Sequence, residues 1–207
     1  MMTIHLHQGD LPDGLDLGPT IAVDSETMGL VTTRDRLCLV QLSSGDGDAH
    51  LVRLPQQDRP YRAPNLAAQM ADPARLKIFH FARFDIAALK YWLGVDCGPV
   101  YCTKIASKLA RTYTDRHGLA DLCREILAVD LSKQQQSSDW GADQLSDAQM
   151  TYAASDVLHL HALMARLDVM LAREGRADLA QACFDFLPHR VALDLAGFGG
   201  DIDIFHH

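Results

Sequence analysis

The chain has 207 residues, of which 48% are hydrophobic and 22% charged, a composition typical of a globular domain with a full core. Its net charge of −8 argues against a protein that binds long nucleic acid through a broad basic surface, because neutralising phosphates supplies most of the affinity of such proteins. It has no apolar run of the roughly 20 residues that cross a bilayer, no signal-peptide pattern, and no C-x-x-C pair among its five cysteines, so we expect a protein of the reducing cytoplasm without membrane contact.

The first half of the chain carries the pattern of β-strands. Short runs of apolar and β-branched residues recur there, and the run S-G-D-G-D at 44–48 has the residues of a tight turn. We therefore expect a meander of three strands, then a short helix and one more strand. The expected strands cover residues 20–24, 36–43, 50–54 and 76–81.

The second half predicts helices, because apolar residues recur there at steps of three and four. The longest should run over 146–173 with Ser146 or Asp147 as its N-cap, and we expect Pro188 to break or kink the last helix. Strands followed by helices indicate an α/β fold with a mixed central sheet flanked by helices, in one domain over residues 1–207. The expected helices cover residues 65–71, 84–93, 103–111, 119–127, 146–173, and 177–183 or beyond.

An acidic pair ends the first predicted strand. Asp24 and Glu26 are two residues apart, so an extended chain points both to one face and Ser25 away from it. Two carboxylates held close repel each other unless a cation lies between them, and such hard ligands suit Mg²⁺ or Mn²⁺ better than Zn²⁺. Taken alone, the pair is a weak signal, and two solvated acids at a strand end are the favoured interpretation.

Two later positions add carboxylates. Asp85 lies in the first turn of a predicted helix, where an aspartate can also simply complement the helix dipole. Tyr152 and Asp156 are four residues apart and share one face of the longest helix, beside its apolar stripe. An ordinary packed aromatic residue is the alternative interpretation of Tyr152.

The order D-x-E, then an aspartate opening a middle helix, then Y-x-x-x-D resembles the tyrosine-containing branch of the DEDD exonuclease superfamily. Residues 131–156 are similar to the ribonuclease D family, and the whole chain resembles its smaller nano-RNase C group, stand-alone alphaproteobacterial exonucleases of very short oligoribonucleotides. The phrases V-D-S-E-T-M-G-L, K-I-F-H-F-A-R-F-D and S-K-Q-Q-Q-S-S-D-W carry this resemblance. It implies a ribonuclease H-like exonuclease fold without the C-terminal helical nucleic-acid-binding domain of ribonuclease D.

The resemblance also implies hydrolysis with two divalent ions, Mg²⁺ or Mn²⁺. Asp24 would bridge the ions, Glu26 and Asp156 would complete the site of the attacking water, and Asp85 would hold the second ion through water. Tyr152 would position the attacking water rather than act as a strong base, since the reference pKa of tyrosine is about 10.

Further residues are candidates for substrate contact. Leu30 resembles the residue that wedges between the last two bases, with turn packing as the alternative. Basic side chains at 104–116 can meet phosphates or simply face solvent, and the run at 134–138 can form a polar loop facing the substrate. His80 can orient the second motif or serve as a hydrogen-bonded structural histidine. The full set is Thr27, Leu30, His80, Lys104, Arg111, Arg116 and Gln135.

Two activities follow from these motifs. The first is a 3′-5′ exoribonuclease that converts short oligoribonucleotides, dinucleotides included, to 5′-mononucleotides. The alternative is broader ribonuclease D-like trimming of RNA, or of single-stranded or duplex DNA, because the acids do not distinguish the two polymers. An inactive binding module is disfavoured, since all four acids and the tyrosine are present. The resemblance implies a homo-oligomer, a ring of eight, and the apolar I-D-I-F tail at 202–205 is a candidate docking segment.

Overall fold

A six-stranded mixed sheet forms the centre of the molecule. The computed structural model describes residues 3–132, 134–135, 137–199 and 204. The strand order is β1-β4-β3-β2-β5-β6, with antiparallel pairs β4-β3 and β3-β2 and parallel pairs elsewhere. The mixed sheet and the predicted meander are therefore confirmed. The strands are β1 (Ile4–Gln8), β2 (Thr20–Thr27), β3 (Leu37–Ser43), β4 (Ala49–Arg53), β5 (Leu76–Phe79) and β6 (Val100–Cys102).

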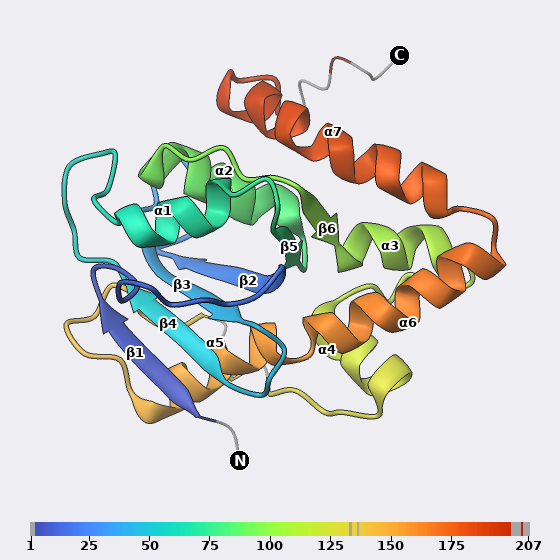
Figure 1. Cartoon of the computed structure of the whole chain (residues 1–207), viewed down its shortest axis with the longest axis horizontal. Helices are drawn as coiled ribbons and strands as arrows, with labels where there is room; N and C mark the ends of the chain where they lie inside the picture. Colours follow the sequence, from blue (N-terminus) through green and yellow to red (C-terminus); the bar gives the residue numbers. More distant parts are fainter. Residues whose placement is uncertain (1–2, 133, 136, 200–203, 205–207) are drawn as a thin grey trace.

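Helices cover both faces of the sheet (Figure 1). On one face α2 packs against the sheet and α7 packs across α2, while on the other face α5 packs against β2, β3 and β4. The core lies between these layers, and every residue of the central strand β3 is buried. The helices are α1 (Pro64–Ala71), α2 (Ala82–Leu93), α3 (Thr103–Ala110), α4 (Leu119–Leu122), the π-helix η1 (Cys123–Leu127), α5 (Asp147–Leu158), α6 (Leu160–Arg173) and α7 (Ala177–Leu195).

The expectation of one long helix over 146–173 was wrong. The chain bends at His159, and two helices result, α5 against the sheet and α6 against α3 (Figure 1). A straight helix cannot follow the sheet and α3 at once, so tertiary packing overrides the continuous apolar stripe. The predicted start is confirmed, because Ser146 and Gln149 form a reciprocal capping box.

Pro188 does not break its helix, although a break or a kink was expected there. Helix α7 continues through it to Leu195. Proline removes one backbone donor and crowds the preceding turn, a cost that burial of apolar side chains on both sides can offset. Phe184, Leu187 and Val191 are all buried on the face that α7 turns to the core.

Sequence patterns missed both edge strands. Strand β1 reads I-H-L-H-Q, with both histidines on one face, and β6 (V-Y-C) is apolar but has only three residues, so neither gives a run long enough to predict a strand. Their partners, β4 and β5, lie far away in sequence, and pairing with them is a tertiary property. None of the helices formed by the described residues has the length and apolar character needed to cross a membrane.

Candidate active site

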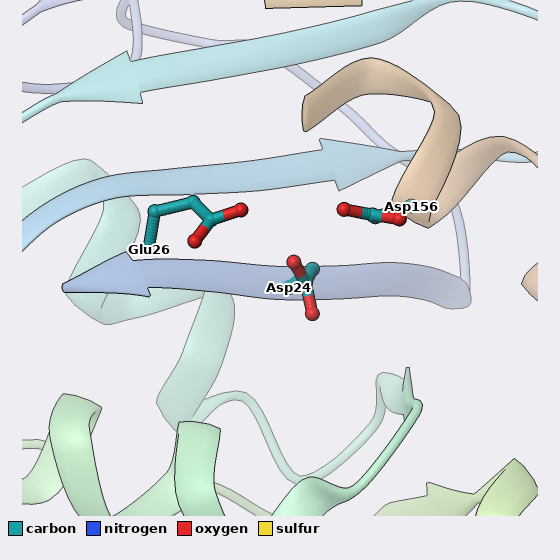
Figure 2. A group of neighbouring side chains, drawn as sticks. All are labelled: Asp24, Glu26 and Asp156. Carbon is teal, nitrogen blue, oxygen red and sulfur yellow. The ribbon is translucent and has the colours of Figure 1, made fainter. Parts of the chain in front are cut away.

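Three carboxylates converge above strand β2 (Figure 2). Asp24 and Glu26 come from alternate positions of β2, as the spacing predicted, and Asp156 comes from α5. One oxygen of each lies within 4.8 Å of the others. Helix α5 is held in place by its capping box and by the buried side chains of Ala153 and Val157, which pack toward the sheet.

Burial and mutual repulsion change the acidity of this group. Burial raises the pKa of Asp24 to about 7. Burial, followed by the charges of Asp24, Asp156 and Asp85, raises the pKa of Glu26 to about 10. Burial and then Asp24 also raise the pKa of Asp156. Three anions in so small a volume therefore disfavour full ionisation unless a cation neutralises them.

The arrangement fits a hard divalent cation. Two oxygens on opposite sides of one Mg²⁺ lie roughly 4 Å apart, because the Mg–O distance is about 2.1 Å. The observed spacing, within 4.8 Å, is therefore close to the span of two oxygens across one ion. Its donors are all carboxylate oxygens, which Mg²⁺ and Mn²⁺ prefer.

Asp85 lies next to this group rather than within it. It is 3% exposed in the first turn of α2, and burial followed by the charge of Asp24 raises its pKa. The Ser25 hydroxyl donates a hydrogen bond of 2.6 Å to Asp85 Oδ1. Ser25 does alternate away from Asp24 and Glu26, yet it contacts the fourth acid, a link that strand alternation alone did not reveal.

Tyr152 lies one helical turn before Asp156 and lines the same cavity. Its ring centroid lies 6.0 Å from that of Trp140. Burial first, and then the charges of Asp156, Glu26 and Asp24, raise the pKa of the Tyr152 phenol above its usual range. The hydroxyl is therefore protonated at neutral pH and can orient a neighbouring oxygen without acting as a strong base.

A cavity of about 730 Å³ opens over the carboxylates. Four predicted contact residues line it: Thr27, Leu30, His80 and Lys104. Leu30 is 86% exposed, so its side chain does not pack within the turn. His80 Nδ1 lies 2.9 Å from Thr103 Oγ1, which makes it a hydrogen-bonded histidine, and burial followed by the charge of Lys104 lowers its pKa to about 3.

The structure does not bring the other three predicted contact residues to the cavity wall. Arg111 is 1% exposed and forms an ion pair with Glu125 inside the fold. Arg116 pairs with the same carboxylate at 2.8 Å. Gln135 accepts a hydrogen bond from Ser138, and Ser138 itself lines the cavity. The polar loop thus reaches the site through its serines, and two of the predicted arginines stabilise the loop after α3.

Sequence reasoning missed Phe81 at the cavity rim. Its backbone is left-handed, with φ of 70°, and the residue is 47% exposed. Lys104 Nζ lies 4.1 Å from the ring centroid. An aromatic ring beside an ammonium group can take a base and a phosphate side by side. A phenylalanine in an apolar strand pattern gives no sequence signal for this position.

Buried carboxylates grouped on the central sheet of this α/β fold are the arrangement expected of a metal-dependent nuclease. A family model described as a 3′-5′ exonuclease matches residues 12–172, and the chain belongs to this family. Ribonuclease D of Acidiphilium cryptum is 36% identical over 168 residues, which cover 81% of this chain and 42% of that protein. The chain thus spans about two fifths of the length of this curated relative.

Solved structures of nucleases are similar to this chain. Brucella melitensis NrnC bound to pGG has a TM-score of 0.95 and 52% identity, with 100% of both chains covered. NrnC with bound Mg²⁺ has a TM-score of 0.93 and 51% identity, with 99% of both chains covered. Escherichia coli RNase D has a TM-score of 0.72 and 27% identity over 84% of this chain and 45% of that one. The exonuclease fold and the resemblance to nano-RNase C are confirmed.

Proposed function

We propose that residues 1–207 form a single exonuclease domain that hydrolyses short oligoribonucleotides, dinucleotides included, from the 3′ end to 5′-mononucleotides. The observation that carries this proposal is the group of three carboxylates within 4.8 Å, set in a cavity of about 730 Å³. A cavity of this size is in the range that encloses small ligands. The net charge of −8 also argues against a long phosphate track.

Two divalent ions, Mg²⁺ or Mn²⁺, are the proposed cofactors. Bound there, such ions supply a hydroxide at neutral pH and stabilise charge on the leaving oxygen. Asp24, Glu26 and Asp156 would hold them, and Asp85, oriented by the Ser25 hydroxyl, would complete the site. A neighbouring structure, NrnC with bound Mg²⁺, supports the metal assignment.

Other side chains would position the substrate. The protonated Tyr152 hydroxyl would orient the attacking water, and Glu26 would accept a hydrogen bond from the terminal 3′-OH. Leu30, exposed at the rim, would insert between the last two bases, and Lys104 would meet a phosphate. The structure of Brucella melitensis NrnC bound to pGG supports a short substrate.

The alternative is broader trimming of RNA or DNA 3′ ends. It is favoured by the ribonuclease D relative, which is 36% identical to this chain. The match covers 42% of that relative. We place short RNA first because Brucella melitensis NrnC bound to pGG is 52% identical over 100% of both chains.

A length series separates the two. Labelled RNA and DNA strands from two nucleotides upward are incubated with Mg²⁺ or Mn²⁺, and mononucleotide release is followed over time. We expect the dinucleotide to be cleaved at least as fast as any longer strand, and Asp156→Asn to abolish cleavage. Asp58→Asn, an exposed acid before α1, is the matched control. Much slower cleavage of the dinucleotide than of a long strand would establish the alternative.

Assembly and location are also proposals. A homo-oligomer, a ring of eight, and a cytoplasmic location follow from the resemblance and the cysteine pattern. The I-D-I-F tail falls at 202–205, of which 202, 203 and 205 lie outside the described residues. Exposed apolar side chains such as Leu179 and Phe186 on α7 offer a surface for self-association. Light scattering that finds a monomer would refute the oligomer.

A further inference from the structure

Three histidines cluster at the edge of the sheet that β1 forms. His5 and His7 occupy alternate positions of β1 and so share a face, and His50 is the register partner of His5 on the parallel strand β4. The ring of His50 stacks against both, with centroid distances of 4.7 Å to His5 and 5.2 Å to His7. The carboxylate site, by contrast, is built on β2 and α5.

The nitrogens of this cluster already lie close together. His7 Nε2 and His50 Nδ1 are 2.9 Å apart and share a hydrogen bond, whose proton a bound ion would replace. Two imidazole nitrogens bound to one Zn²⁺ at about 2.0–2.1 Å lie roughly 3.0–3.5 Å apart. A small separation of these two rings would therefore admit an ion between their nitrogens.

A carboxylate and a third ring complete the possible ligands. His5 Nε2 lies 3.6 Å from Asp48 Oδ2, and the two side chains are 41% and 35% exposed. Among the described residues, only the acidic group brings three ligand atoms within 4.8 Å of one another, so the three histidines are not yet that close. His5, whose ring is stacked on His50, must therefore turn about its side-chain bonds to become the third ligand, and its exposure leaves room for this.

We propose that His5, His7 and His50 bind one borderline transition-metal ion, with Zn²⁺, Ni²⁺ or Cu²⁺ as the chemical class. Imidazole suits these ions, whereas the all-oxygen group around Asp24 suits Mg²⁺ and Mn²⁺. The two sites would therefore select different ions from the same solution. This proposal does not depend on the proposed nuclease activity.

Binding there would join β1 to β4. His50 lies 43 or more residues from the two histidines of β1 in sequence, and β4 is the one strand with which β1 pairs. An ion that binds the folded chain and not the unfolded one stabilises it by mass action. The expected consequence is a higher melting temperature with Zn²⁺ that depends on the histidines.

Copper as a spectroscopic probe tests the site directly. The full chain receives one equivalent of Cu²⁺ in the presence of saturating Mg²⁺, and electron paramagnetic resonance records the ligand hyperfine structure. Nitrogen hyperfine lines identify imidazole ligands, which the oxygen-only site cannot produce. We expect lines from at least two nitrogens in the wild type, and their loss in both His7→Gln and His50→Gln.

Two controls isolate the cluster. His189→Gln, an exposed histidine on α7, and the double substitution His206→Asn with His207→Asn at the C-terminus should both keep the nitrogen lines. Zn²⁺ should raise the melting temperature of the wild type and not of His50→Gln. Circular dichroism of His7→Gln and His50→Gln checks that each remains folded. Absence of nitrogen lines in the wild type, or their retention in both cluster variants, would overturn the proposal.

Discussion

Removing one charge from the acidic cluster should stabilise the metal-free protein while abolishing its activity. Asp24→Asn is the most informative substitution, because the charge of Asp24 is, after burial, the next largest cause that raises the pKa of Glu26, Asp85 and Asp156. Asparagine has nearly the same shape and keeps a polar side chain at this position. The substitution therefore removes repulsion with little change in packing.

The magnitude follows from the geometry of the cluster. Two unit charges 4.8 Å apart repel each other by about 3 kcal/mol at an effective dielectric constant of about 20. Partial protonation and salt reduce this value, so we expect the free energy of unfolding to rise by about 2 kcal/mol. For a chain of this size, 1 kcal/mol raises the melting temperature by about 2–4 °C. The expected gain is about 4–8 °C.

The pH dependence has a defined sign. Asp24 titrates at about 7 when folded, against 3.8 ordinarily, and Glu26 at about 10, against 4.5. A folded-state pKa above the unfolded one means that stability is lost as pH rises through the folded value. The metal-free wild type should therefore lose stability between pH 5 and pH 9. The increase in stability of Asp24→Asn over wild type should be largest at the upper end of this pH range.

Chemical denaturation with a chelator present provides the assay. Unfolding free energies of wild type, Asp24→Asn and the control Asp58→Asn are compared at pH 5, 7 and 9, and again with Mg²⁺. Added Mg²⁺ should remove most of the difference, because the ion neutralises the cluster in the wild type. A metal-free Asp24→Asn that is no more stable than wild type at pH 9 would refute the electrostatic reasoning.

Three further predictions concern the surroundings of the acids. Ser25→Ala should raise the Mg²⁺ concentration needed for half-maximal cleavage, because it removes the hydroxyl that donates to Asp85. Ser25→Thr keeps that hydroxyl and should need the same Mg²⁺ concentration as wild type. Equal Mg²⁺ requirements in the two variants would contradict this role. The pKa of His80 is lowered to about 3, so between pH 6.5 and pH 3 the unfolded chain binds a proton that the folded chain does not. From pH 7 to pH 5, the free energy of unfolding of wild type should therefore fall by about 2 kcal/mol more than that of His80→Gln, as measured by urea titration. Tyr152→Phe should slow mononucleotide release on the order of 100-fold without lowering the melting temperature, and an unchanged rate would remove the hydroxyl from the mechanism.

Sequence patterns predicted the elements that carry the acids. The run T-I-A-V-D gave a strand with Asp24 and Glu26 on one face, and the helix start at Ser146 was correct. These features depend on local periodicity and capping, which a short stretch of sequence contains. The continuous apolar stripe over 146–173 gave a wrong prediction of one helix, because periodicity is also a local property. It cannot indicate the bend between α5, which packs against the sheet, and α6, which packs against α3.

Local patterns were weakest for side chains whose role depends on burial. Arg111 looked like a surface cation beside other basic residues, yet it is 1% exposed and paired with Glu125. Phe81 looked like a core residue and lies at the cavity rim instead. Whether a long cation reaches solvent, or an aromatic ring leaves the core, is decided by neighbours distant in sequence.

The sequence alone determined the order and chemical type of the acids. It also determined that Asp24 and Glu26 share one face of a strand and that Tyr152 and Asp156 share one face of a helix. Tertiary structure decided how close the acids come, that Ser25 orients Asp85, and that the histidines of β1 meet His50. The physical reason is the distance along the chain over which each interaction acts. Hydrophobic periodicity and capping act within a few residues, whereas parallel strand pairing and the approach of α5 to β2 join segments far apart in the chain and depend on the packing of the whole core.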